Sequence, residues 1–282
     1  MEHIRTATAA LATTLTAVAL AGATGPAQRE DGGPGAQGGP WAGGSVTTVG
    51  KLVTDLGDGR TGVCSGAIVD SPSGSVIATA AHCLTSPDRP DRPRAAWFAP
   101  GYEAGPGAGS GALGAEGAME HGWKVVSYHV PPGWDVNRPL EDILPHDYAF
   151  VTVEKKQGRS VQEEFGANRL DFAPVDPGSP VLPMGYPAAP PYDGLRLVHC
   201  SGRAELLTAR TAHAANVGGL LLAPCRLTQG ASGGPWLQDF DAASGSGTVV
   251  GVMSVGSGDG QVLGRPFPAA TGRALYAEAT AV

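Results

Sequence analysis

Basic residues are scarce in this chain of 282 residues. Its 19 lysines and arginines are outnumbered by 26 aspartates and glutamates, which gives a formal net charge of −7 at pH 7 and a sequence pI of 5.4. A domain that binds nucleic acid or an acidic membrane surface ordinarily presents a basic patch. The charge balance therefore argues against nucleic acid and anionic lipid as partners.

Long apolar runs are also few. The one candidate lies near the N-terminus, where Arg5 precedes an apolar run over residues 7–21 and small residues at 19–23 fit a cleavage site. This pattern is typical of a secretory signal peptide, and an N-terminal membrane anchor is the alternative. We expect a signal peptide over residues 1–23, secretion to the extracellular space, and no membrane association after cleavage. No other segment approaches the length that spans a bilayer.

Cysteine is rare, with four residues in the whole chain. Export to an oxidising compartment would permit disulfides, and four cysteines allow three pairings. The alternative use of cysteine is a metal site, but the sequence has no CxxC or HExxH spacing. The sequence therefore predicts no metal and no organic cofactor.

Helical periodicity is nearly absent as well. Residues 24–44 are rich in Gly, Pro and Ala, which predicts a disordered propeptide or linker. Beyond them, short apolar segments separated by turn residues predict an all-β domain over residues 45–282, with a short Ala-rich helix near its end. The expected strands cover residues 61–70, 75–79, 123–130, 147–153, 181–186, 194–200, 216–223 and 247–255, and the expected helix covers residues 271–281.

Two segments far apart in the chain carry chemistry. Gly-Ala-Ser-Gly-Gly-Pro at 230–235 places Ser232 among glycines, and Thr-Ala-Ala-His-Cys at 79–83 contains His82. A serine hydroxyl becomes a good nucleophile when a histidine takes its proton and backbone N–H groups hold the oxyanion that forms. Glycines beside Ser232 permit a tight turn and leave the hydroxyl uncovered. The plainer alternatives are an ordinary turn serine and a structural histidine.

These segments resemble the serine and histidine signatures of the chymotrypsin/trypsin-like serine peptidases, whose usual forms are GDSGGP and TAAHC. The order of His82 before Ser232 also fits the chymotrypsin type, because other folds with this triad place its members in a different order. The resemblance implies two six-stranded antiparallel β-barrels with a short C-terminal helix. It also implies a secreted, monomeric serine endopeptidase whose partners are polypeptide substrates.

A carboxylate must orient the imidazole of His82, and Asp147 is the best candidate. It opens the apolar, β-branched segment 147–153, which is similar to the family's Asp-Ile-Ala-Leu type segment. The rivals Asp135 and Asp142 have no strand behind them. The predicted catalytic triad is therefore His82, Asp147 and Ser232.

The same resemblance assigns further roles. The N–H groups of Gly230 and Ser232 would form the oxyanion hole. The segment of Ser254, Val255 and Gly256 would pair with the extended substrate backbone, and the alternative for it is an ordinary strand end with a glycine turn.

The resemblance also implies how the cysteines pair. In the family a disulfide clamps the histidine loop, which corresponds here to Cys64–Cys83. Cys200 and Cys225 are then left to pair with each other near the serine loop.

Two positions depart from the family pattern. Ala231 stands where trypsin-like zymogens have an aspartate that pairs with a new N-terminal ammonium, and no obvious activation sequence occurs near residue 49. We therefore expect the oxyanion hole to form without that ion pair. Arg226 would correspond to the floor of the specificity pocket, six residues before the serine. The cysteine that the family has four residues before the serine is absent here, and Cys225 lies seven residues before it, which favours a solvated loop arginine.

Two other functions fit the same motifs. One is a secreted binding or adhesion module on a peptidase-like barrel with little turnover, and the other is a secreted esterase that uses the same triad.

The long interval 85–145 has no assigned role. Within it, residues 88–94 and 105–111 are of low complexity and predict exposed loops.

Overall fold

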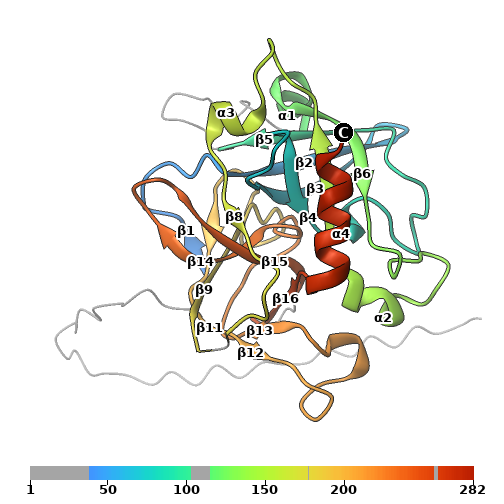
Figure 1. Ribbon diagram of the computed structural model, residues 1–282, viewed down its shortest axis with the longest axis vertical. Helices are drawn as coiled ribbons and strands as arrows, with labels where there is room; N and C mark the ends of the chain where they lie inside the picture. The colour runs from blue at the N-terminus through green and yellow to red at the C-terminus, as the bar shows by residue number, and fades with distance from the viewer. Residues whose placement is uncertain (1–37, 103–114, 177, 257–259) are drawn as a thin grey trace, which may run out of the picture. The chain divides into compact units, whose positions relative to one another are not determined.

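Strands dominate both halves of the molecule (Figure 1). The computed structural model describes residues 38–102, 115–176, 178–256 and 260–282. The all-β fold class expected from the sequence is confirmed. Among these described residues, no helix has the length and apolar character needed to cross a membrane.

The first half closes into a six-stranded barrel with the strand order β2-β3-β4-β7-β6-β5. Each neighbouring pair is antiparallel, and closure leaves the barrel without an exposed edge. The strands are β2 (Val49–Gly57), β3 (Arg60–Ile68), β4 (Val76–Thr79), β5 (Ala95–Pro100), β6 (Trp123–His129) and β7 (Ala149–Val153).

The second half differs from the expected second closed barrel, because over the described residues it is an open sheet. Its order is β1-β10-β9-β14-β15-β16-β13-β12, while β11 pairs with β9 and β8 pairs with β15. The chain segment 186–234 is rich in proline and glycine, and it contains only the short strands β10 to β13. The strands are β1 (Gly39–Pro40), β8 (Arg169–Leu170), β9 (Pro180–Gly185), β10 (Val198–His199), β11 (Gly202–Arg203), β12 (Glu205–Leu206), β13 (Leu220–Leu222), β14 (Pro235–Asp241), β15 (Ser246–Gly256) and β16 (Val262–Pro266).

Helices are short, apart from α4 (Ala269–Thr280), which is the C-terminal helix expected from the sequence. α4 packs on β6 and β7 of the barrel (Figure 1). Thr152 Oγ1 donates a hydrogen bond to the carbonyl of Ala279 at 2.9 Å, and Tyr276 Oη donates to the carbonyl of Asp70 at 2.6 Å. The other helical segments are α1 (Ala115–His121), α2 (Leu140–Ile143), α3 (Val161–Phe165) and the 3-10 turns η1 (Ala81–Cys83), η2 (Leu144–His146) and η3 (Ala214–Asn216).

Several elements have no counterpart among the expected strands. β2, β5, β14 and β16 each contain or adjoin glycine or proline, which weakens their strand pattern. Conversely, the expected strand at 194–200 is reduced to β10, and the one at 216–223 is reduced to β13, which follows η3. The expected loop at 88–94 contains no strand, whereas the loop expected at 105–111 lies outside the described residues.

Residues 38–44, expected to belong to a disordered linker, instead pack against the open sheet. Gly39 and Pro40 pair antiparallel with β10. The ring of Trp41 meets those of His199 and Phe240 edge-on, with centroids 5.0 and 5.4 Å apart. The folded domain therefore begins before residue 45. The expected signal peptide and the remainder of the linker lie outside the described residues.

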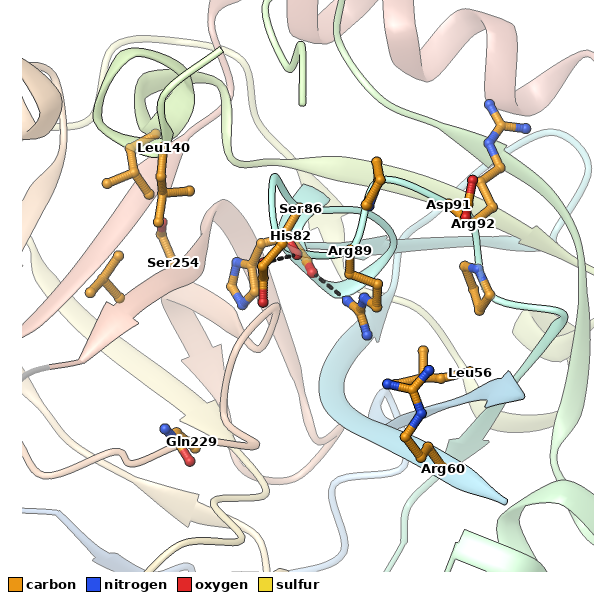
Figure 2. A pocket seen from close by; sticks show the side chains of 15 residues that line it. Leu56, Arg60, His82, Ser86, Arg89, Asp91, Arg92, Leu140, Gln229 and Ser254 are labelled. Carbon is orange, nitrogen blue, oxygen red and sulfur yellow. Dashed lines mark hydrogen bonds between the residues drawn. The ribbon is translucent and has the colours of Figure 1, made fainter. Parts of the chain in front are cut away.

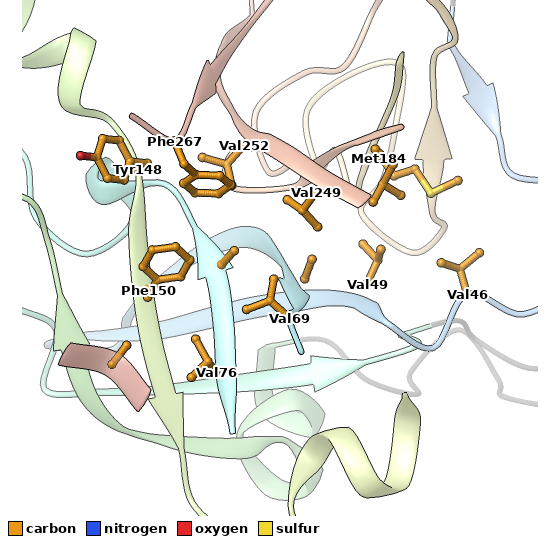
Figure 3. Close-up of a cluster of buried hydrophobic side chains, with 14 of the residues drawn as sticks. Val46, Val49, Val69, Val76, Tyr148, Phe150, Met184, Val249, Val252 and Phe267 are labelled. Atoms are coloured by element: carbon orange, nitrogen blue, oxygen red, sulfur yellow. The ribbon is translucent and has the colours of Figure 1, made fainter. Parts of the chain in front are cut away.

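An apolar core is shared between the barrel and the open sheet (Figure 3). Phe150 of β7 and Val252 of β15 both belong to it, and Phe267 stacks on Phe150 with ring centroids 5.3 Å apart. Each buried side chain of this size contributes about 1.5–3 kcal/mol to folding. Tyr148 is part of the same core, so the backbone beside Asp147 is held firmly between the two halves.

Candidate active site

His82 is placed by the turn that follows strand β4. The strand ends at Thr79, and the chain then enters the 3-10 turn η1, which contains His82. The backbone N–H groups of Leu84 and Thr85 both donate to the carbonyl of Ala81, which closes the turn. The His82 side chain is 27% exposed, so it remains reachable from solvent.

One of the two disulfides braces this turn. Cys83, the residue after His82, is bonded to Cys64 of β3, and Cys200 is bonded to Cys225. These are the pairs that the family resemblance implied. The first pair is 19 residues apart in sequence, and closing a loop of this length in the unfolded chain stabilises the fold by about 3 kcal/mol.

Asp147 lies at the end of η2, just before β7, and it is fully buried. Its Oδ2 accepts a hydrogen bond from His82 Nδ1 at 2.8 Å, and its Oδ1 accepts one from the backbone N–H of His82 at 2.9 Å. Ser254 Oγ donates to the same Oδ2 at 2.5 Å. With the ring proton on Nδ1, the Nε2 atom of His82 is left as a proton acceptor.

His82 and Asp147 each stabilise the charged form of the other. Burial lowers the pKa of His82, but the negative charge of Asp147 and the hydrogen bond to it more than compensate, so the pKa is raised overall. Burial raises the pKa of Asp147, but the charge of His82 and the three hydrogen bonds hold the pKa below its ordinary value. The result is an ionised carboxylate beside an imidazole that is a stronger base than free histidine.

Ser232 stands on a turn that is fastened to both halves of the fold. Its carbonyl accepts a hydrogen bond from the N–H of Ser65 in β3 at 2.7 Å, and the N–H of Gly233 donates to Met253 in β15 at 2.7 Å. A Cβ on Gly233, whose φ is +78°, would lie 2.2 Å from Thr79 Oγ1. Only glycine fits there, which brings Ser232 close to the segment that carries His82. Within the described residues no hydrogen bond joins Ser232 to His82.

The backbone before Ser232 adopts one defined orientation. Gly230 has a φ of +99°, and a Cβ there would lie 2.7 Å from the carbonyl oxygen of Tyr186. The carbonyl of Gln229 accepts a hydrogen bond from the N–H of Ala188 at 2.6 Å. Because the C=O and N–H of a trans peptide point in opposite directions, the N–H of Gly230 points away from Ala188. Among the described residues, neither this N–H nor that of Ser232 has an acceptor.

Ser65 holds the same turn through its side chain, a contact that the sequence did not predict. Its buried hydroxyl donates to the carbonyl of Gly230 at 2.8 Å and accepts from the N–H of Tyr186 at 2.9 Å. The only local signal was its position directly after Cys64. A single serine in a strand has no motif that would identify it.

Comparison with known protein families identifies the family of this chain. The sequence profile of the trypsin-like peptidase domain matches residues 64–252. The chain belongs to this family. The enzyme class expected from the sequence, a trypsin-like serine endopeptidase, is thereby confirmed.

Solved structures agree with the family. The peptidase is similar to the protease Anisep from Arthrobacter nicotinovorans, with 26% identity, a TM-score of 0.69, and coverage of 87% of this chain and 100% of that one. It is also similar to the thermostable serine protease AL20 from an extremophilic microorganism, with 28% identity, a TM-score of 0.66, and coverage of 84% and 99%. A Glu endopeptidase at 16% identity and a TM-score of 0.61 shares the fold, with coverage of 87% and 97%. A search among curated proteins found no match.

The rival carboxylates of the peptidase lie apart from His82. Asp135 accepts hydrogen bonds from Asn137, and Asp142 is 3.4 Å from Arg138 across an exposed ion pair. The structure therefore joins only Asp147, of the three acidic candidates, to the imidazole.

Ala231 is fully buried, with its Cα against Gly185. In this peptidase the turn before Ser232 is thus fixed by the hydroxyl of Ser65 and the N–H of Ala188, not by a carboxylate at position 231.

Arg226 is exposed at the surface. Its backbone lies near Gly38, on the side of the Cys200–Cys225 disulfide.

A cleft of about 900 Å³ runs past His82 (Figure 2). Ser254 and Val255 of β15 border it together with Leu140, and Arg89 and Arg60 border it elsewhere. Val255 is 40% exposed. Gly256 is also exposed, and a Cβ there would lie 2.6 Å from the carbonyl oxygen of Leu227. The end of β15 is therefore exposed at both Val255 and Gly256, and Val255 borders the cleft.

Proposed function

We propose that the protein is a secreted endopeptidase in which His82, Asp147 and Ser232 act as the catalytic triad. The observation that carries this proposal is the double hydrogen bond from His82 to the buried Asp147, next to a turn that presents Ser232. The two disulfides support an oxidising, extracellular location.

The reaction follows from these positions. His82 Nε2 takes the proton of Ser232 Oγ as this oxygen attacks the scissile carbonyl carbon. The C–N bond then breaks, the acyl group stays on Ser232, and His82 gives its proton to the leaving amine. Water next loses a proton to His82 and attacks the acyl carbon, the ester bond breaks, and the proton returns to Ser232 Oγ. Asp147 stays ionised throughout and stabilises the imidazolium.

The oxyanion of each tetrahedral intermediate is held by the N–H groups of Gly230 and Ser232. Their lack of an acceptor among the described residues supports this role, because both are available when the substrate arrives. The missing hydrogen bond between Ser232 and His82 fits an enzyme without substrate, where such bonds are often long. The segment Ser254 to Gly256 would pair with the acyl half of the substrate, because Val255 opens into the cleft.

A fluorophosphonate label tests this proposal against a binding module. Only an activated serine reacts with the label, so we expect one modified residue, Ser232, found by peptide mapping. Digestion of a diverse peptide library by the same sample then separates a peptidase from an esterase. Labelling without any peptide cleavage, together with hydrolysis of small esters, would favour the esterase.

Activity should depend on the protonation of His82. Only the neutral imidazole can accept the proton of Ser232, so kcat/KM should fall as the pH is lowered through the pKa of His82. Because that pKa is raised, the midpoint of the fall should lie above pH 6.5, the ordinary histidine value. A pH profile of kcat/KM with one neutral peptide substrate measures it. A midpoint below 6.5, or a flat profile, would contradict the assigned base.

Removing the hydroxyl of Ser65 should lower kcat. In Ser65→Ala the carbonyl of Gly230 loses the hydroxyl that holds it, so the peptide between Gly230 and Ala231 is less firmly fixed and the turn that carries the N–H groups of Gly230 and Ser232 is less well positioned. Losing an oxyanion donor costs about 10²–10³ in kcat, and a positioning defect should cost about tenfold, with KM little changed. Thr48→Val is the matched control, because it removes a buried hydroxyl that bonds Gly245 away from the site. An equal loss of kcat in both variants would show that Ser65 acts only on stability.

A further inference from the structure

Two arginine side chains converge in the cleft beside His82. Arg89 lies on the loop that follows the histidine turn, and Arg60 is the first residue of β3. Figure 2 shows their guanidinium groups pointing toward each other on the side of His82 away from Ser254 and Leu140. Leu56 lies next to Arg60 and supplies an apolar floor there.

Arg89 is fixed before any ligand arrives. Its backbone exchanges two hydrogen bonds with Ser86, at 2.8 and 2.9 Å. Its Nη2 donates to the carbonyl of His82 at 2.9 Å, and a Cβ on Gly62 would come within 3.4 Å of Nη1. The Nε of Arg89 is buried without a hydrogen-bond partner. A guanidinium held in one place loses little entropy when it binds an anion.

Asp88 and Asp91 also line the cleft, but Asp88 offsets the positive charge of Arg89 only through space. Within the described residues neither Arg60 nor Arg89 forms an ion pair. The nearby Asp88 is held by the hydroxyl of Ser86 at 2.6 Å. Burial lowers the pKa of Arg89, Asp88 raises it, and the charge of Arg60 lowers it further, which reflects two like charges close together. Such a pair favours a carboxylate between the two cations.

The location of the pair decides which part of a substrate it meets. The acyl half of the chain would lie along Ser254 and Val255, on one side of His82. The polypeptide beyond the scissile bond then continues past His82 toward Arg89 and Arg60. An extended chain advances about 3.3 Å per residue, so the first two residues of the leaving half lie within reach of a side chain that bonds these arginines.

We propose that Arg60 and Arg89 form a carboxylate-binding subsite on the leaving-group side of the cleft, which makes the enzyme prefer an acidic residue at the first or second position after the scissile bond. This inference rests on the proposed endopeptidase function. It adds a substrate class to that function and assigns a use to part of the long interval after His82.

The test uses one peptide that the enzyme cleaves in the library digest. It is resynthesised with Glu, Gln or Lys at the first and, separately, the second position after the scissile bond, and kcat/KM is measured for each. At one of the two positions we expect wild type to prefer Glu over Gln by about five- to tenfold, and Gln over Lys. In Arg60→Gln and Arg89→Gln the Glu-to-Gln ratio should fall to about twofold or less. The ratio within each variant cancels any general loss of rate, which matters for Arg89 because it also supports His82.

Arg210→Gln is the control for net charge, since Arg210 is exposed and lies outside the cleft. It should keep the wild-type Glu-to-Gln ratio. A second measurement is independent of turnover: Ser232→Ala should bind the Glu peptide about fivefold more tightly than the Gln peptide in a calorimetric titration. Equal kcat/KM for Glu, Gln and Lys at both positions would overturn the inference and leave the endopeptidase function standing. If no library peptide is cleaved, the proposed function fails and the inference fails with it.

Discussion

Ser232→Ala should fold as the wild type does and lose peptide hydrolysis by about 10⁶-fold. The side chain of Ser232 makes no hydrogen bond within the described residues, so its removal leaves no protein group without a partner. What is lost is the nucleophile, and with it the acyl-enzyme route. The rate that remains should be about 10³–10⁴ above that in water, because the oxyanion hole and substrate binding are still present.

The measurement is kcat/KM with a peptide substrate, together with the stoichiometry of fluorophosphonate labelling and the thermal midpoint. Ser244→Ala is the matched control, because it deletes an exposed serine hydroxyl in the turn between β14 and β15. The control should keep full activity and full labelling. If Ser232→Ala retained wild-type turnover, the assignment of the nucleophile would be wrong.

The parts of the site that could be predicted are those whose residues are contiguous in sequence. The pentapeptide that contains His82 and the glycine turn around Ser232 each form a local structure that needs particular residues at neighbouring positions. Asp147 was recognised because a polar residue directly precedes an apolar, β-branched strand. In the structure Asp147 and His82 are hydrogen bonded, as this interpretation requires.

The parts that could not be predicted depend on long-range contacts. Ser65 is separated from Gly230 by 165 residues and acquires its role only when β3 meets the serine turn. Arg60 and Arg89 are likewise far apart in sequence. The segment around Arg89 looked like a solvated loop of low complexity, which is correct for its secondary structure but says nothing about the cleft it lines.

The second half of the fold was harder to anticipate for a related reason. Strand β10 has two residues and β13 has three, so each is too short to show alternation of apolar and polar residues. The family resemblance implied a closed barrel there, but the ladder of the described residues is open. By contrast, the apolar β7 and β15 were predicted within a few residues of their ends, because a continuous run of buried apolar residues carries a strong pattern.

Asp147→Asn should lower kcat by about 10⁴-fold although it changes neither size nor shape. Three donors converge on the carboxylate: the Nδ1 and backbone N–H groups of His82, and the hydroxyl of Ser254. An amide offers one oxygen and one NH₂ group, so it cannot accept all three bonds. If its oxygen keeps the bond from the backbone of His82, its NH₂ group faces Nδ1. The imidazole must then move its proton to Nε2, where it can no longer accept the proton of Ser232.

Removing the carboxylate should also change the pH dependence. The charge of Asp147 raises the pKa of His82, so in Asp147→Asn the midpoint of the remaining activity should shift to lower pH. Ser254→Ala is the comparison, because it keeps the carboxylate and removes one of its three hydrogen bonds. A hydrogen bond to a charged group is worth about 1.5–3 kcal/mol, so this variant should lose at most about 10- to 150-fold and keep its midpoint above 6.5. Activity of Asp147→Asn within tenfold of wild type, with an unchanged midpoint, would mean that Asp147 supports the fold of the turn and not the base.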